Sequence, residues 1–264
     1  MASIKDSIEE VSIEGFSAYI KFGGLGALLY YCIYLYLQNP NNLDGWFYLV
    51  SFVSYILLTG FLLKTTSNVK NGHDNILPSF NVFHLIGHGL KGLVALGPVV
   101  FVNLFLANKV GQFLVNLFEG YGMESVVGTY IILSITYILF FSFIFTAYLL
   151  YASKFNITDA YNLRLISKYS MDIILPILFF IPQIIFVDIL FIGAITYLFW
   201  IFMGNPIENN WCVWFWCAAF IWNLAISGHY MAQLDYEIID YSENSSDGVL
   251  NLAQTIYDQD KKDV

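Results

Sequence analysis

Long apolar blocks alternate with short polar segments along the whole chain, and this alternation predicts an all-α membrane protein. About twenty apolar residues in a helix cross the hydrocarbon core of a bilayer. Six blocks reach or approach this length, at residues 16–37, 46–63, 90–107, 126–151, 173–203 and 211–230. We therefore expect a polytopic bundle of about six transmembrane helices, occupying residues 16–232.

The fifth block is too long for a simple crossing. Residues 173–203 form an apolar run that only Asp188 interrupts. As one straight helix the run would measure roughly 46 Å, against a hydrocarbon core of about 30 Å. It must therefore tilt, project beyond the bilayer or break, and Pro176, Pro182 and Gly193 offer places to bend. One span is favoured over two.

Two shorter segments predict helices at the membrane surface. Ile4, Ile8 and Val11 share one helical face, so residues 1–15 are expected to form an amphipathic helix that packs on the protein's own cytoplasmic face. Residues 64–79 are polar and are expected to form a loop, followed by an interface helix that bends into the third span near Gly97 and Pro98. Residues 158–169 are expected to be helical, with Thr158 or Asp159 as the N-cap.

Composition and charge agree with a membrane location and exclude one class of partner. The 264 residues are 58% hydrophobic and 12% charged, whereas soluble domains carry about 25% charged residues. The net charge of −9 argues against nucleic-acid binding, because phosphate recognition needs clustered Lys and Arg. Residues 233–264 are predicted to form an acidic soluble tail.

Basic residues predict the orientation. With six spans, one side receives nine of the eleven Lys and Arg residues and the other side receives Lys109 alone, while Lys91 lies at the start of the third span. The positive-inside rule then places both termini in the cytoplasm and the protein in the cell membrane. Glycines at 23, 24 and 26 predict close helix packing in the first span.

Two segments resemble a known family. The LPSF and GHGLKGLVALGP motifs of residues 77–98, and SGHYMAQLDYE of residues 227–237, are similar to motifs of the prokaryotic membrane family called domain of unknown function 4013. Ser79 departs from that pattern, where an acidic residue is usual. The resemblance implies a six-helix membrane protein, and it implies no activity and no site residues.

Five polar residues are the candidate functional positions. His84 and His88 are four residues apart on one helical face, a spacing that can hold a metal, and His229 is expected at a similar depth. Asp188 and Lys91 are charges in or beside apolar runs, where they are expensive and often functional. The alternative interpretation gives these residues no functional role. In it the histidines lie at the membrane–water interface, the Lys91 side chain extends to that interface, and Asp188 lies near the outer surface of the membrane. No Cys pair or HExxH motif sharpens a metal site, so no cofactor is expected.

Three functional hypotheses follow. The first is a membrane protein without catalytic activity that organises other membrane components through its helix faces, with the bilayer and another membrane protein or a second copy as partners. The second is a transporter that uses intramembrane polar residues around a broken fifth helix. The third is an intramembrane enzyme that uses the histidines, and it has the least support.

Overall fold

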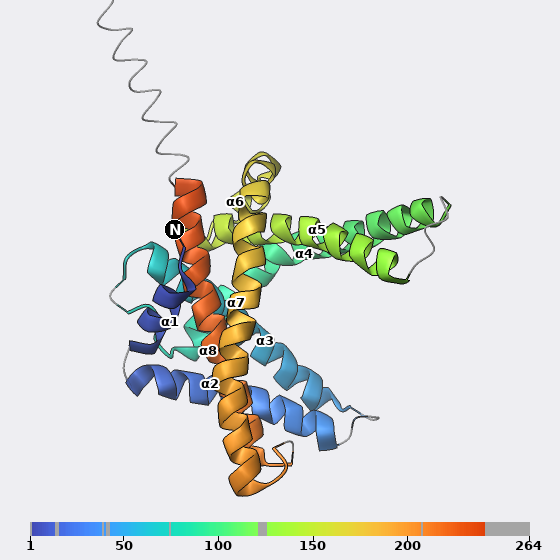
Figure 1. Ribbon diagram of the computed structural model, residues 1–264. Helices are drawn as coiled ribbons and strands as arrows, with labels where there is room; N and C mark the ends of the chain where they lie inside the picture. Colours follow the sequence, from blue (N-terminus) through green and yellow to red (C-terminus); the bar gives the residue numbers. More distant parts are fainter. Residues whose placement is uncertain are drawn as a thin grey trace, which may run out of the picture.

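The computed structural model describes residues 2–13, 16–38, 40, 43–73, 75–120, 126–206 and 208–240 (Figure 1). Every regular element in these ranges is a helix. The helices are α1 (Ile4–Ile13), α2 (Phe16–Gln38), α3 (Gly45–Lys70), α4 (Val82–Gly120), α5 (Val126–Lys154), α6 (Ile157–Ala160), α7 (Leu163–Met203) and α8 (Asn210–Leu234), which a π-helical segment (Asp235–Asp240) continues.

Six of these helices, α2, α3, α4, α5, α7 and α8, are long and apolar enough to cross a membrane. This result confirms the predicted helical class and the six candidate spans. The fifth candidate is one unbroken helix of 41 residues, although Pro176 and Pro182 lie inside it. The run at 173–203 therefore belongs to a single candidate span, and the additional length extends toward Leu163.

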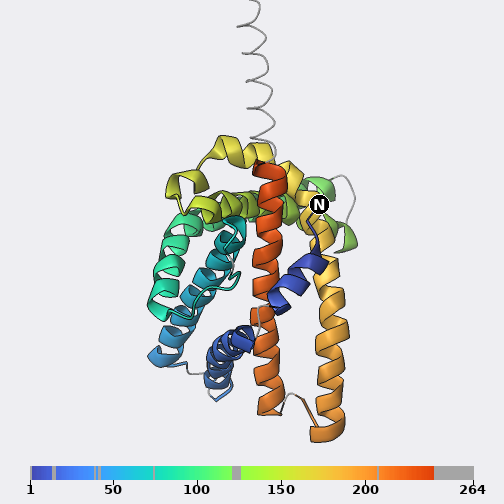
Figure 2. The same cartoon turned by 90° about the vertical axis from the view of Figure 1, so that its left-hand side faces the viewer.

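The long helices spread as three arms from a common base (Figures 1 and 2). One arm is the α2–α3 hairpin, the second is formed by α4 and α5, and the third by α7 and α8. In Figure 1 the α2–α3 arm points between the other two. The arms meet where the C-terminal parts of α3, α5 and α8 contact one another and α1 packs on α8.

Glycines allow the closest approaches between helices. A Cβ on Gly26 of α2 would lie 2.7 Å from the backbone nitrogen of Ala218 in α8. A Cβ on Gly60 of α3 or Gly89 of α4 would likewise collide with the backbone of the other helix. The close packing predicted for the first span is thus confirmed at Gly26, and a second glycine contact joins α3 to α4.

Three local predictions differ from the structure. Helix α3 continues to Lys70, so the polar segment expected to form a loop from residue 64 begins as helix. Helix α4 runs from Val82 through Pro98 without interruption, so the expected interface segment forms its first turns. The side chains of Asn156 and Asn162, instead of Thr158 or Asp159, cap α6 and α7, because an Asn amide oxygen can accept from the first free backbone N–H groups.

Helix α1 lies within the N-terminal segment predicted to be helical, and it packs on α8. The proposed acidic tail begins within the described residues, where Asp235–Asp240 continue the last helix. Residues 241–264 lie outside the described residues.

Candidate functional site

A cluster of hydrogen-bonded polar side chains holds the base of the three arms together. We call it the polar junction, and it comprises Ser7, Thr66, Lys70, Tyr148, His229 and Asp235. The hydroxyl of Thr66 in α3 lies 2.6 Å from the Tyr148 hydroxyl of α5 and 3.1 Å from the Gly228 carbonyl oxygen of α8. Because a buried polar group is expensive unless it is hydrogen-bonded, these contacts fix the three helices in one register.

His229 attaches α1 to α8. The ring is buried, with 2% of its surface exposed. Its Nδ1 lies 3.0 Å from Ser7 Oγ and 3.2 Å from Gln233 Nε2, and its Nε2 lies 2.7 Å from Glu10 Oε2. Gln233 Oε1 also accepts from the Ser3 backbone N–H at 2.6 Å. Both ring nitrogens are thus occupied by partners on α1 or α8.

Ser7, His229 and Glu10 are connected serine to histidine to carboxylate, as in a hydrolase triad. Their environment does not suit catalysis. A nucleophilic serine must reach its substrate and give its proton to the histidine. Ser7 is fully buried, and its hydroxyl also donates to the Ser3 carbonyl oxygen at 3.0 Å. The arrangement therefore supports attachment of α1 better than nucleophilic chemistry.

An ion pair joins the C-terminal ends of α3 and α8. Lys70 at the end of α3 contacts Asp235 directly after α8. Asp235 is 1% exposed, and removing one partner of a buried pair leaves the other charge without compensation. Together with Thr66 and Gly228, this pair shows that α3 and α8 run in the same direction at the polar junction.

The three predicted histidine ligands do not converge. His84 and His88 form their own pair on α4, with Nε2 atoms 3.3 Å apart and the His88 ring against Phe155. His229 is bound at the polar junction instead. Across the part of the chain that the structure describes, no group of three His, Cys, Asp or Glu side chains could hold a metal ion. The structure therefore does not assemble the three-histidine site considered from the sequence.

Asp188 has a partner that the sequence did not identify. Its Oδ1 accepts a hydrogen bond from the Asn223 amide of α8 at 2.8 Å, about halfway along α7's apolar run. Thr196 of α7 accepts from the Trp216 indole at 2.7 Å. Lys91, the partner considered from the sequence, is exposed on α4. The Asp188 contact therefore joins the two helices of one arm.

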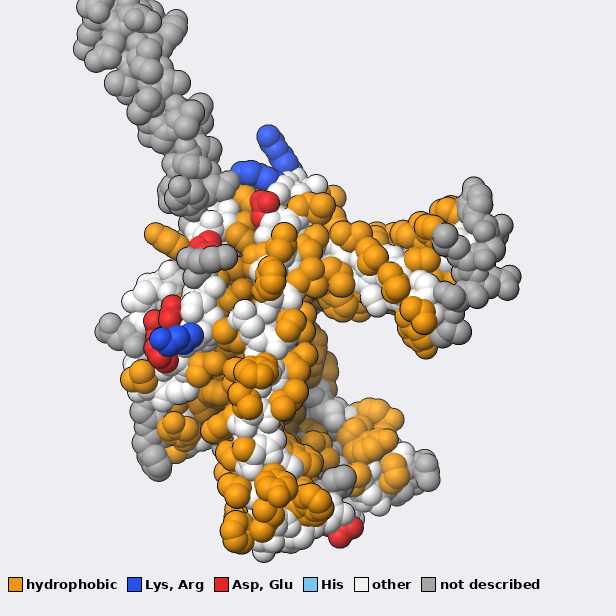
Figure 3. All heavy atoms as spheres, viewed as in Figure 1, with side chains coloured by type: hydrophobic (Ala, Val, Ile, Leu, Met, Phe, Trp, Pro, Cys, Tyr) orange, Lys and Arg blue, Asp and Glu red, His pale blue; other side chains and the backbone are white. Residues whose placement is uncertain are grey.

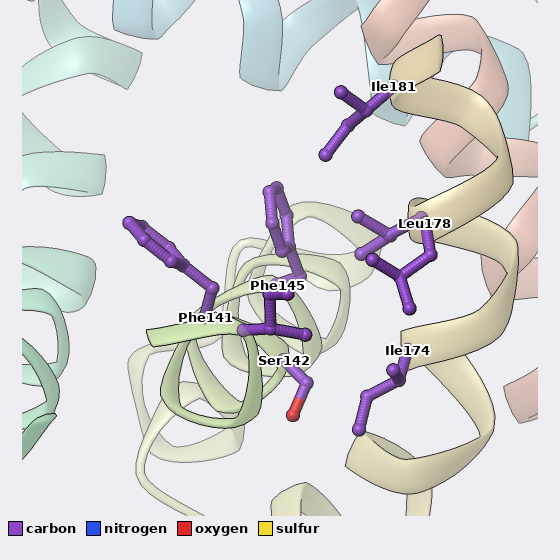
Figure 4. Close-up of a pocket in the computed structure, with 8 residues that line it drawn as sticks. Phe141, Ser142, Phe145, Ile174, Leu178 and Ile181 are labelled. Carbon is purple, nitrogen blue, oxygen red and sulfur yellow. The ribbon is translucent and has the colours of Figure 1, made fainter. Parts of the chain in front are cut away.

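Two of the cavities among the described residues bear on ligand binding. The first, about 220 Å³, lies between α5 and α7, and Phe141, Phe145, Ile174, Leu178 and Ile181 surround it (Figure 4). The only polar side chain in its lining is Ser142, whose hydroxyl donates to Leu139 at 2.7 Å. This cavity offers apolar contact and no reactive group.

The second cavity is polar and lies at the end of α3. It has a volume of about 360 Å³ and is lined by Lys64, Asn68, His73, Asn75, Leu77 and Ser79. Of the five residues proposed from the sequence, none lines it. It is the better candidate for a ligand, because several hydrogen-bonding groups converge on one space.

Charged side chains on the face in Figure 3 gather around α1 and the base of the arms, while hydrophobic side chains cover much of the arms. Sequence reasoning missed the junction residues Thr66, Tyr148 and Ser7. The run of Thr65, Thr66, Ser67 and Asn68 looked like a loop, yet all four residues are buried. Four small hydroxyl and amide residues directly after an apolar span were the available signal.

Comparisons of this chain with protein-family models, with curated proteins and with solved structures find no match.

Proposed function

We propose that this membrane protein organises other membrane components, acting without catalysis and presenting its divergent arms to neighbouring transmembrane helices. One observation carries the proposal: the arms separate from a single base and leave large apolar side chains exposed along their length (Figures 1 and 3). On α4, Phe101, Phe105 and Phe113 are 73%, 53% and 64% exposed. Lipid covers such side chains, and so does another helix that packs well against them.

The helix lengths suit divergent arms that all cross one bilayer. A helix tilted from the bilayer normal needs more residues to cross the same core. Helices α4 and α7 have 39 and 41 residues, or roughly 58 and 61 Å at 1.5 Å per residue. Helices α2, α3 and α8 have only 23, 26 and 25 residues. We infer that α4 and α7, the two longest helices, cross tilted.

The polar junction supports the proposed cytoplasmic termini. The ends of α3, α5 and α8 meet there, so Lys64, Lys70 and Lys154 lie near the same end of the molecule. By the positive-inside rule we place this end, with both termini and the acidic tail, in the cytoplasm. A cysteine at Tyr161 should then react with an impermeant maleimide only after cells are opened, and one at Glu208 in intact cells, once the three native cysteines are replaced.

We also propose that this chain belongs to the prokaryotic membrane family called domain of unknown function 4013. Its two motifs, residues 77–98 and 227–237, contain Gly89 at the α3–α4 contact and His229 at the polar junction. Their residues thus include some that hold the base of the arms together. This placement would explain why those short motifs matter in a family with no assigned activity.

Photocrosslinking in native membranes tests the organising function. A benzoylphenylalanine residue replaces Phe105 or Phe113 on the arm, and Phe83, 88% exposed at the base of the same helix, is the control position. We expect a discrete protein adduct from the arm positions that mass spectrometry identifies as this chain or one other membrane protein. Lipid adducts alone at both arm positions would contradict the proposal.

A transporter is the second candidate, and the Asp188–Asn223 contact favours it. Asn223 Oδ1 is buried, has no hydrogen-bond partner among the described residues, and lies next to a carboxyl group inside an apolar arm. Intramembrane carboxyl groups commonly lie on proton or cation paths. In proteoliposomes loaded with a pH-sensitive dye, a proton flux abolished by Asp188→Asn and retained by Thr196→Val would establish transport and displace the first proposal.

A further inference from the structure

The polar cavity at the end of α3, which we call the Lys64 cavity, contains groups suited to an anion. Lys64 projects from α3, and His73, Asn75 and Ser79 come from the segment that connects α3 to α4. These four side chains offer an ammonium group, an imidazole, an amide and a hydroxyl. None of the six lining residues is acidic, and Asp74 lies outside the described residues.

Lys64 differs from the other lysine near the end of α3. Lys70 pairs with Asp235, whereas half-buried Lys64 forms no ion pair with any described residue. The side chains of His73, Asn75 and Ser79 also make no hydrogen bond within the described part of the chain. A cation beside free donors, with no carboxylate among the described residues of the cavity lining, is an arrangement that an anionic ligand completes.

The segment that carries these donors is held in place by other residues. The Asn68 amide donates to the carbonyl oxygens of Asn75 and Ile76, at 3.3 and 3.1 Å. Lys21 of α2 donates to the Leu77 carbonyl oxygen at 3.4 Å. The cavity wall is thus fixed before any ligand arrives, which reduces the entropy lost on binding.

The position of the Lys64 cavity favours a lipid over a soluble ion. Lys64 lies six residues before the end of α3, and therefore roughly 9 Å along the helix from it. The exposed ring of Phe80 follows directly after Ser79, and that of Phe83 lies three residues further on. A polar cavity followed by exposed aromatic rings is typical of the boundary between headgroups and acyl chains.

We propose that the Lys64 cavity binds a phosphate-bearing anion, namely the headgroup of an anionic phospholipid in the leaflet at the base of the arms. Lys64 contacts the phosphate, and Asn75 and Ser79 donate hydrogen bonds to its oxygens. A soluble phosphate ester shares this chemistry, and the experiment below separates the two sources. The proposal does not depend on the organising function.

The test measures binding of dihexanoyl phosphatidylglycerol to the full-length protein in detergent by native mass spectrometry. Dihexanoyl phosphatidylcholine serves as the zwitterionic comparison, and inorganic phosphate is added as a competitor. Lys64→Met is compared with Lys154→Met, which removes the same charge from an exposed position at the end of α5. A thermal unfolding curve of each variant confirms that it is folded.

We expect Lys64→Met to weaken phosphatidylglycerol binding by about tenfold or more, since hydrogen bonds to charged groups are strong. Lys154→Met should change it by no more than about twofold, because Lys154 is exposed and does not line the cavity, and exposed charges are screened. Asn75→Ala and Ser79→Ala, which remove donors but no charge, should weaken it by an intermediate amount. Phosphatidylcholine should bind more weakly than phosphatidylglycerol, and Lys64→Met should reduce its affinity less.

Each outcome bears on the proposal. Displacement by millimolar inorganic phosphate would support the anion site and assign it to soluble phosphate. Resistance to phosphate together with the Lys64 effect would support the lipid headgroup. Equal losses of phosphatidylglycerol affinity in Lys64→Met and Lys154→Met, or equal affinity of the wild type for both lipids, would overturn the proposal. If Lys64→Met does not fold, Asn75→Ala and Ser79→Ala decide by the same comparison.

Discussion

The glycine contact between α3 and α4 gives the sharpest stability prediction. A Cβ on Gly89 would lie 2.8 Å from the Ile56 carbonyl carbon and 2.9 Å from Ile56 Cγ2. A Cβ on Gly87, two residues earlier in the same helix, would meet nothing within 4 Å. Gly89→Ala and Gly87→Ala therefore add the same methyl group to one helix in two different environments.

The expected magnitudes follow from these distances. Restoring a carbon–carbon separation of about 3.5 Å requires the two backbones to move apart by roughly 0.7 Å at Gly89, and the Ile56 carbonyl oxygen, which lies closer still, requires a larger movement. Overpacking of this kind costs about 1–3 kcal/mol, and a rigid carbonyl cannot rotate away. Replacing a helical glycine by alanine stabilises the helix by about 0.8–1.0 kcal/mol at either position, because alanine has the higher helix propensity. We expect Gly87→Ala to be neutral or stabilising, and Gly89→Ala to be less stable than it by about 1–3 kcal/mol.

Reversible unfolding in mixed micelles with increasing dodecyl sulfate measures this difference. Labelling of the buried thiols of Cys212 and Cys217 reports the loss of tertiary structure independently. Gly60→Ala, which places its methyl group against Leu85 from the α3 side, should behave like Gly89→Ala. Equal unfolding free energies for the Gly89 and Gly87 variants would refute the close contact.

Three further variants examine the polar contacts. Thr66→Val should reduce the free energy of unfolding by about 1–3 kcal/mol, because it leaves the Tyr148 hydroxyl and the Gly228 carbonyl oxygen without this interhelical partner. Half-buried Thr59 bonds only to its own helix, so Thr59→Val should change the free energy of unfolding little in the same titration. His229→Ala should release α1 from α8, so trypsin should cut the folded variant at Lys5 faster than it cuts the folded wild type. Equal cutting rates would argue against the attachment of α1 to α8 through His229. Asp188→Asn should raise the fraction of α7 segments that insert into the membrane in a translocation assay, because an Asp at the bilayer centre raises the insertion free energy by about 2.5–3.5 kcal/mol. An unchanged fraction would place Asp188 near the membrane–water boundary.

Local patterns were sufficient to predict most of the helices. The apolar runs placed all six long helices, and the spacing of Ile4, Ile8 and Val11 placed α1. A helix satisfies its backbone hydrogen bonds within one segment, and in lipid this requirement is strict. The run at 173–203 was therefore readable as one element, although its continuation to Leu163 was not.

The polar sites were harder to predict, because a polar residue gives no local sign of its partner. The segment of Thr65 to Asn68 is as hydrophilic as a loop, and only contacts with α5 and α8 explain its burial. The histidine spacing at 84 and 88 correctly indicated a neighbouring pair, but it could not show that His229 belongs elsewhere.

The sequence alone determined that the chain is helical, that six segments suit lipid, and roughly where they begin and end. The tertiary structure decided that the arms diverge, that glycines bring α3 against α4, and that donors converge around Lys64. The physical reason is distance along the chain. Hydrophobic periodicity acts within a few turns, whereas Ser7 and His229 are 222 residues apart and meet only once the helices have packed.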